Sequence, residues 1–325
     1  MNLVRRKFLL LSVGAAAGPL VPYSAPADAP APRPVHVVVG FPPGGLGDII
    51  VRLISPSLQQ RLGESVIVDY RPGAGGNLAT ETVVKSPPDG GTLILAGPRD
   101  AIDATLYRNL PYDFIRDVAM VAGIMRSPFV MMTNPAFGAK SAAEFIAYAK
   151  SNPGKINVAS SGIGTAPHLA GELLQMMAGV SMVHVPYRGD AAALADLAAG
   201  RVQLMFVSAV AALGFVRDGR LRALAVTSLN ASPVLPGIPP LASIVPGYEV
   251  SVWLALGAPK ATPPGTVAAL NKAVNASLGE GAIVDRLHEL GAEPIVMSPR
   301  ELDAFVAADT ERWATAVKFS GAKVD

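Results

Sequence analysis

The stretch VVVGFPPGGLGD, residues 37–48, joins a run of valines to a helical pattern through a turn rich in glycine and proline. A helix that begins here directs unpaired backbone N–H groups and the positive end of its dipole toward the end of the strand, an arrangement suited to an anion. The stretch matches neither G-x-G-x-x-G nor G-x-x-x-x-G-K-[ST], so a nucleotide is disfavoured. A tight strand-to-helix connection without a ligand is the alternative. We interpret Asp48 as a partner of the helix dipole rather than as an acid catalyst.

Short apolar runs recur along the rest of the chain and alternate with helical patterns. The runs are continuous rather than alternating, which is typical of strands in a parallel sheet that helices cover on both faces. The sequence therefore predicts an α/β protein with two sheets. We expect strands at Val35–Val39, Val66–Val68, Leu93–Ala96, Val118–Gly123, Phe129–Thr133, Ile156–Ala159, Met182–Val185, Gln203–Val207 and Leu224–Thr227.

Capping residues mark several helix boundaries. Ser141 followed by Glu144 forms a capping box, and Ser298 combines a second box with a proline at the first helical position. The Gly279-Glu280-Gly281 stretch separates two helical patterns near the C-terminus. Pro56 lies inside an apolar helical pattern, and we expect it to kink or end that helix because proline removes a backbone donor.

The chain has 325 residues, which is more than one ordinary domain core. We expect residues 28–130 and 227–325 to form one lobe and residues 131–226 to form a second. Two strands would then cross between the lobes, and such a hinge permits closure on a ligand. A separate third domain built from the last hundred residues is the alternative.

Residues 1–27 are interpreted as an export signal that is cleaved near Ala27, so the mature protein would be periplasmic. Arg5-Arg6-Lys7 precedes an apolar stretch that ends at Pro19 and Pro22, and Ala25-Pro26-Ala27 offers small residues for cleavage. The two arginines resemble a twin-arginine signal, although an ordinary secretory signal has the same features. An uncleaved membrane anchor is the minority interpretation, because about 20 apolar residues are needed to span a bilayer.

The composition excludes several classes of function. The chain contains no cysteine, which removes disulfides, thiolate nucleophiles and cysteine-ligated metals. Its net charge of +2 becomes −1 without residues 1–27, because that segment holds three of the 27 basic residues and none of the 25 acidic ones. We therefore expect no nucleic-acid partner. The four histidines lack metal-ligand spacing, and we expect no metal, no cofactor and no enzyme activity. An exported hydrolase that uses Ser160 and His168 is the alternative.

A second turn of the same kind follows the strand expected near residue 158. It is rich in glycine and hydroxyl groups, which suit a carboxylate, and a phosphate is the alternative anion. The hydroxyls can also serve only as helix caps. Arg99 and Tyr187 also follow strands, and Arg99 could pair with a ligand carboxylate unless Asp100 engages it first. The residues of the turn that we select are Ser160, Ser161, Gly162, Gly164, Thr165 and His168.

Motifs spread over residues 33–325 together resemble one family, the extracytoplasmic solute-binding proteins of the tripartite tricarboxylate transporter system, also called Bug proteins. Several of the motifs are weak individually, and their combination is specific. They are Phe41-Pro42-Pro43-Gly44-Gly45 with Asp48, Tyr70-Arg71-Pro72-Gly73-Ala74-Gly75-Gly76-Asn77, Pro88-Asp89-Gly90, Leu110-Pro111-Tyr112-Asp113, Ala159-Ser160-Ser161-Gly162, His168-Leu169-Ala170-Gly171-Glu172-Leu173 and Val183-His184-Val185-Pro186-Tyr187-Arg188-Gly189.

The resemblance implies a two-lobed, type II-like periplasmic binding fold, with a hinge of crossing strands and a ligand cleft between the lobes. It implies a monomer that captures a small organic anion, a di- or tricarboxylate or an aromatic carboxylate, and presents it to membrane permease subunits; a sensor kinase is an alternative partner. The ligand-binding residues that follow from the motifs and from the two turns are Phe41, Pro43, Gly44, Gly45, Asp48, Arg99, Ser160, Ser161, Gly162, Gly164, Thr165, His168, Tyr187 and Ser208.

The chain departs from the family pattern at three places near the expected ligand. Val207-Ser208 stands where the family often has an Asp-Asn pair, Leu46-Gly47 replaces Pro-Thr, and Arg99 replaces a small or polar residue. Without the acidic partner after the strand, we expect a ligand that lacks an ammonium group at that end. A dicarboxylate or an aromatic carboxylate is therefore favoured over an amino acid.

Overall fold

The computed structural model describes residues 33–233 and 235–323. The predicted export signal and its cleavage position lie outside these residues. The chain from Arg33 onward forms one unit of mutual contacts. Within the described residues, no helix is both long and apolar enough to cross a bilayer.

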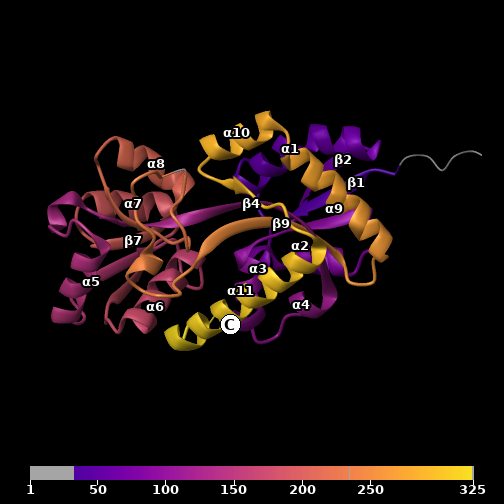
Figure 1. The fold of residues 1–325 in the computed structure, drawn as a ribbon. Helices are drawn as coiled ribbons and strands as arrows, with labels where there is room; N and C mark the ends of the chain where they lie inside the picture. The colour runs from indigo at the N-terminus through magenta and orange to yellow at the C-terminus, as the bar shows by residue number, and fades with distance from the viewer. Residues whose placement is uncertain (1–32, 234, 324–325) are drawn as a thin grey trace, which may run out of the picture. The chain divides into compact units, whose positions relative to one another are not determined.

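In the described chain, ten strands form a single mixed sheet with the order β2-β1-β3-β9-β4-β7-β5-β6, and β8 and β10 pair with β4. Figure 1 shows the long strands β4 and β9 side by side in the middle of the fold. Neighbours within β2-β1-β3 and within β6-β5-β7 are parallel, whereas β9 is antiparallel to both β3 and β4. The strands are β1 Val35–Val39, β2 Val66–Tyr70, β3 Thr92–Ala96, β4 Val118–Thr133, β5 Asn157–Ser160, β6 Val183–Pro186, β7 Leu204–Ser208, β8 Arg222–Val226, β9 Ser251–Pro259 and β10 Glu293–Pro294.

Strand β4 explains why one sheet forms where the sequence predicted two. Residues 118–123 and 129–133, expected as separate strands, are parts of one strand of 16 residues. Its first part, Val118–Pro128, pairs with β9, and its last part, Phe129–Thr133, pairs with β7 and β8. We call the strands on the β9 side sheet region 1 and those on the β7 side sheet region 2. Because β9 pairs with β3 as well, the C-terminal segment returns to region 1. The division into lobes at residues 131 and 226 stays a prediction.

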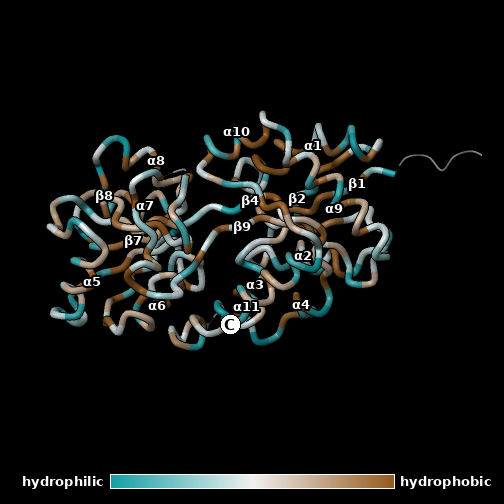
Figure 2. The backbone as a smooth tube through the Cα atoms, in the orientation of Figure 1, coloured by the Kyte–Doolittle hydropathy of each residue, from teal (hydrophilic) through white to brown (hydrophobic). Residues whose placement is uncertain are grey.

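Helices cover both faces of the sheet, as the continuous apolar strands predicted, and the α/β fold class is confirmed. In region 1, α1, α9 and α10 pack on one face, and α2, α3 and α11 pack on the other. In region 2, α5 and α6 belong to the same hydrophobic core as α2, α3 and α11, while α7 and α8 cover the opposite face of the sheet. Hydrophobic residues concentrate along the strands (Figure 2). The helices are α1 Leu46–Leu62, α2 Asn77–Val84, α3 Pro98–Leu106, α4 Phe114–Asp117, α5 Ala142–Ser151, α6 Ala166–Ala178, α7 Asp190–Ala198, α8 Ala209–Arg217, α9 Pro264–Leu278, α10 Gly281–Glu289 and α11 Pro299–Ser320, with 3₁₀ turns η1 Ala74–Gly76, η2 Pro135–Phe137 and η3 Leu241–Ser243.

The expected helix boundaries are confirmed where side chains cap them, whereas a helix end at Pro56 is not found and a kink there stays a prediction. Ser141 accepts a hydrogen bond from the Glu144 amide at the start of α5, and Ser298 forms a full capping box with Glu301 at the start of α11. Pro56, however, does not end its helix, since α1 continues through it to Leu62. The helix buries a full apolar stripe against the sheet, and this burial outweighs one missing backbone hydrogen bond.

Candidate functional site

A cavity of about 590 Å³ lies where the strands of both sheet regions end and their helices begin. The turn before α1 and the turn before α6, the two segments singled out in the sequence, both contribute to its wall. Its lining is mostly apolar, and its charged groups are one guanidinium and two carboxylates. The lining residues are Phe41, Leu46, Gly75, Pro98, Arg99, Ile102, Asp103, Leu106, Tyr107, Phe129, Ser161, Ile163, Gly164, Thr165, Ala166, Pro167, Asp190, Ser208 and Val252.

Five helices of the described chain begin at this cavity, each with a first-turn or N-cap residue in the lining. The residues are Leu46 for α1, Pro98 for α3, Ala166 for α6, Asp190 for α7 and Ser208 for α8. The first N–H groups of a helix have no partner within it, and the dipoles place positive potential at these ends. Crevices at the carboxyl ends of parallel strands are where open α/β sheets bind ligands. The arrangement therefore favours an anionic group in the cavity.

A neighbouring cavity of about 400 Å³ shares part of the wall, including Phe41, Leu46 and Arg99. It extends along the start of α1 to Gly45 and Asp48. Asp48 is already engaged there, because it accepts hydrogen bonds from the Gly44 amide at 2.8 Å, from Tyr70 at 2.5 Å and from Arg52 at 2.5 Å. The bond from Tyr70, followed by that from Gly44, holds the pKa of Asp48 below its usual value. Asp48 therefore stays ionised, and its hydrogen bonds hold the turn in place.

Arg99 joins two buried carboxylates at the start of α3. Its guanidinium donates to Asp100 at 2.6 Å and to Asp103 at 3.2 Å, and further bonds reach Asn77 and Thr80 on α2. The two carboxyl groups are only 1% and 7% exposed. Burial raises the pKa of Asp103 to about 6 against the opposing effect of Arg99. Arg99, Asp100 and Asp103 together carry one positive and two negative formal charges. Arg99 is therefore not available to a ligand as an unpaired cation.

The position of Arg99 depends on a glycine beside it. A Cβ on Gly76 would lie 2.8 Å from Arg99 Nε, and Gly76 has a φ of +104°, a conformation that side chains rarely adopt. The guanidinium carbon of Arg99 also lies 5.9 Å from the centre of the Phe41 ring. Phe41 is half exposed, and a cation–π contact of this kind orients the ring at the cavity wall.

The second turn is held by its own hydroxyl groups rather than offering all of them to a ligand. Ser160 and Thr165 both donate to the Gly162 carbonyl oxygen. The Ser160 hydroxyl is fully buried and lies 2.6 Å from His184 Nε2, so the Ser160–His168 pair of the hydrolase alternative does not form. The physical reason is that β5 and β6 are adjacent, which pairs Ser160 with the neighbouring strand.

His168 lies beneath the same turn. Its Nδ1 accepts a hydrogen bond from the Gly164 amide at 3.1 Å, and its ring stacks on that of His184 with centres 3.8 Å apart. Burial, followed by the proximity of His184, lowers the pKa of His168 to about 4. Burial also lowers the pKa of His184. Both rings are therefore neutral at pH 7, as the acceptor role of Nδ1 requires.

The structure brings some of the predicted site residues to the cavities and leaves others in supporting positions. Phe41, Arg99, Ser161, Gly164, Thr165 and Ser208 line the larger cavity, and Gly45 and Asp48 line the neighbouring one. Neither lining includes Pro43, Gly44, Ser160, Gly162, His168 or Tyr187. The Tyr187 hydroxyl instead donates to Asp196 on α7 at 2.8 Å.

Several lining residues were missed by the sequence reasoning. Asp103 and Asp190 bring carboxylates to the larger cavity, although no acidic residue follows β7. The absence of an acid at that one position therefore does not make the wall free of carboxylates. The spacing of Asp103 four residues after Arg99 on one helix was a usable signal for their ion pair. No local sequence signal indicated that Asp190 lines the cavity, because acidic residues are common in the first turn of a helix.

Replacing Gly164 with alanine is expected to weaken ligand binding about tenfold and to destabilise the fold by about 1–3 kcal/mol. The new Cβ would lie 2.5 Å from Leu106 Cδ2, and both residues line the cavity. Gly179→Ala at the end of α6 is a matched control, because it has a similar positive φ with no atom within 4 Å of its Cβ. Titration calorimetry and thermal unfolding measure both effects; equal behaviour of the two variants would contradict the close contact.

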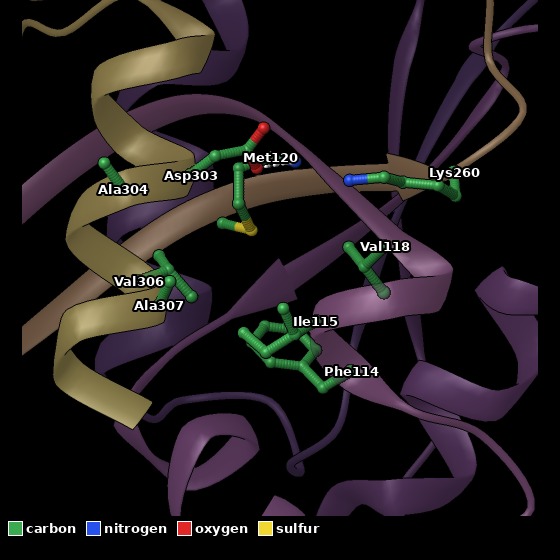
Figure 3. A pocket seen from close by; sticks show the side chains of 9 residues that line it. All are labelled: Phe114, Ile115, Val118, Met120, Lys260, Asp303, Ala304, Val306 and Ala307. Atoms are coloured by element: carbon green, nitrogen blue, oxygen red, sulfur yellow. Dashed lines mark hydrogen bonds between the residues drawn. The ribbon is translucent and has the colours of Figure 1, made fainter. Parts of the chain in front are cut away.

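A smaller cavity of about 290 Å³ lies among α4, β4 and α11, away from the helix starts just described (Figure 3). Its polar side chains are Lys260 and Asp303, and Asp303 already accepts a hydrogen bond from the Met120 amide. The rest of its wall is apolar. Among the residues that the structure describes, no group of three acidic or histidine side chains could hold a metal ion.

Comparison with known proteins gives consistent matches. The model of a family described as the tripartite tricarboxylate transporter family receptor matches residues 50–321. Protein BugT of Bordetella pertussis is 36% identical over the full length of both chains. A solved R. palustris protein with adipate is 37% identical with a TM-score of 0.75, covering 90% of this chain and 99% of its own. MatC from Rhodopseudomonas palustris with bound malate is 32% identical with a TM-score of 0.72, covering 89% and 100%.

Proposed function

Since the chain belongs to the tripartite tricarboxylate transporter receptor family, we propose that it captures a small carboxylate outside the cytoplasm and delivers it to membrane permease subunits. The observation that carries the proposal is the convergence of five helix starts on one cavity of about 590 Å³. Helix N-termini stabilise an anion with fixed backbone dipoles, without a permanent counter-charge. The only lining cation in either cavity of the described chain is Arg99, and two carboxylates already engage it.

The body of the ligand is proposed to be apolar. Phe41 and Leu46 lie on one side of the cavity lining, and Ile102 and Leu106 contribute from α3. Pockets with mostly apolar walls and a few directed polar groups bury most of a small ligand's surface. Adipate and malate, the ligands of the two solved relatives, are therefore suitable probes, with benzoate as an aromatic one.

Delivery is proposed to involve movement of the two sheet regions about β4, the strand that pairs with strands of both regions. A ligand favours the closed form only by contacting it better than the open form. In this proposal the turn before α1 and the turn before α6 both contact the same ligand in the closed form. The export signal, the periplasmic location, the monomeric state and the choice of permease or sensor as partner belong to the same proposal.

At least one of the three acids is expected to raise the melting temperature of the mature protein and to bind with 1:1 stoichiometry in calorimetry. A ligand at a hundred times its Kd stabilises by about 2.7 kcal/mol. Ser208→Trp fills the cavity and should weaken binding by at least roughly tenfold. The exposed Ser151 on α5, outside both cavities, provides Ser151→Trp as the control. Binding unchanged in a folded Ser208→Trp protein would refute the proposal that the ligand occupies this cavity.

A further inference from the structure

Asp190 is a carboxylate in the cavity wall that the binding of a simple anion does not require. It is the first residue of α7, and the preceding Gly189 donates from its amide to the Ser161 carbonyl oxygen at 3.3 Å. This bond holds the start of α7 against the second turn, so Asp190 and Ser161 line the cavity together.

The Asp190 carboxylate is incompletely satisfied. Its Oδ1 is buried, and no donor of the described residues lies within hydrogen-bond distance of it. Burial raises the pKa of Asp190, while the nearby Ser161 side chain acts in the opposite direction. The dipole of α7 also favours the ionised form, because an acid in the first turn faces the positive helix end. Asp190 as a whole is only partly buried and lines the cavity, so a donor on a ligand there would give its carboxylate the hydrogen bond that Oδ1 lacks.

The other charges of the cavity offer Asp190 no compensation. Arg99 is bound to Asp100 and Asp103, and no arginine, lysine or histidine of the described chain lies within ion-pair distance of Asp190. The lining thus holds one positive and two negative side chains. A second carboxylate on the ligand would meet Asp190 at short range in a poorly solvated space, where like charges repel strongly.

We infer that Asp190 determines specificity, selecting a monocarboxylate that carries a hydrogen-bond donor, an amine or a hydroxyl, at the end opposite its carboxylate. The carboxylate would bind at the helix starts remote from α7, and the donor would complete the hydrogen bonding of Asp190. This inference rests on the proposed function and makes it more specific. It also replaces the expectation that the ligand lacks an ammonium group, which depended on the position after β7 alone.

Four acids of equal chain length test the inference: 6-aminohexanoate, 6-hydroxyhexanoate, hexanoate and adipate. Calorimetry on the wild-type protein should give tighter binding for the first two than for the last two. Asp190→Asn keeps the size of the side chain and removes its charge. It should weaken 6-aminohexanoate and strengthen adipate, each by about tenfold, as expected for a hydrogen bond to a charged group and for relief of repulsion. Asp285→Asn, on the exposed face of α10, should change neither affinity.

The outcomes separate this inference from the proposed function. Adipate binding tighter than 6-aminohexanoate, or a ratio of the two affinities that Asp190→Asn leaves unchanged, overturns the role of Asp190 while carboxylate binding stands. Failure of all four acids to bind either protein, together with failure of malate and benzoate, overturns the proposed function itself. If 6-aminohexanoate and 6-hydroxyhexanoate bind more tightly than the other two acids, the tighter of these two identifies whether the site takes an amine or a hydroxyl donor.

Discussion

Replacing Arg99 with methionine is expected to lower the free energy of unfolding by about 3–5 kcal/mol, the usual result of removing one partner from a buried ion pair. Methionine keeps much of the length and apolar volume of the side chain but leaves Asp100 and Asp103 without their cation. Both carboxyl groups are almost fully buried, and Asn77 and Thr80 lose their guanidinium donor as well. Denaturant unfolding at pH 8 measures the loss.

The same variant has a diagnostic pH dependence. Without Arg99, the folded-state pKa of Asp103 should rise beyond the present value of about 6, further above the ordinary 3.8. A carboxyl group with a raised folded-state pKa destabilises the fold as the pH rises through that value. The difference in stability between wild type and Arg99→Met should therefore shrink between pH 8 and pH 5. Arg99→Lys, which keeps the charge but not the planar fork, should lose less at every pH. A constant difference would mean that packing alone explains the loss.

Local patterns predicted most of the secondary structure because the forces that set it are local. Runs of β-branched residues, capping serines and paired glycines mark strands and helix ends within a few residues. What the sequence could not predict is pairing at a distance. Residues 118–133 contain two apolar runs, and only the presence of partners along the whole length makes them one strand. The persistence of α1 through Pro56 has the same origin, since burial against the sheet outweighs the local preference.

The candidate site shows the same limit. The two turns were predicted from glycine, proline and hydroxyl content, and both line the larger cavity. The environment of Arg99 was predictable only as far as Asp100 and Asp103 on its own helix; its contacts with Asn77 and Thr80 come from residues about 20 positions away. Asp190 reaches the cavity because β6 lies beside β5, which sets the start of α7 next to Ser161. Such neighbours follow from strand order, which no short motif encodes.

Acidification from pH 6.5 to pH 4 is expected to destabilise the protein by about 3 kcal/mol through His168 alone, at 1.36 kcal/mol for each unit of pKa shift. The folded-state pKa of His168 is about 4 against 6.5 for the free side chain. Because the unfolded chain takes up the proton first, stability is intact above pH 6.5 and is lost progressively below it. Glu172, 3.6 Å from His168 Nε2, faces the ring, but burial and the stacked His184 dominate.

Protonation of His168 should also lower the affinity for the ligand. A proton on Nδ1 removes the acceptor of the Gly164 amide, and Gly164 lines the cavity. Affinity should therefore fall as the pH drops through the folded-state pKa of His168, about 4. His168→Gln cannot take up a proton, and its unfolding free energy should depend less steeply on pH between 6.5 and 4 even if its stability at pH 8 is lower. The exposed His288 on α10 offers His288→Gln as the control, which should keep the wild-type slope. Denaturant unfolding at several pH values measures these slopes, and parallel curves for wild type and His168→Gln would exclude His168 as the source. The carboxylates with lowered pKa values, such as Asp48, lose their contribution only at lower pH, which keeps the two effects apart.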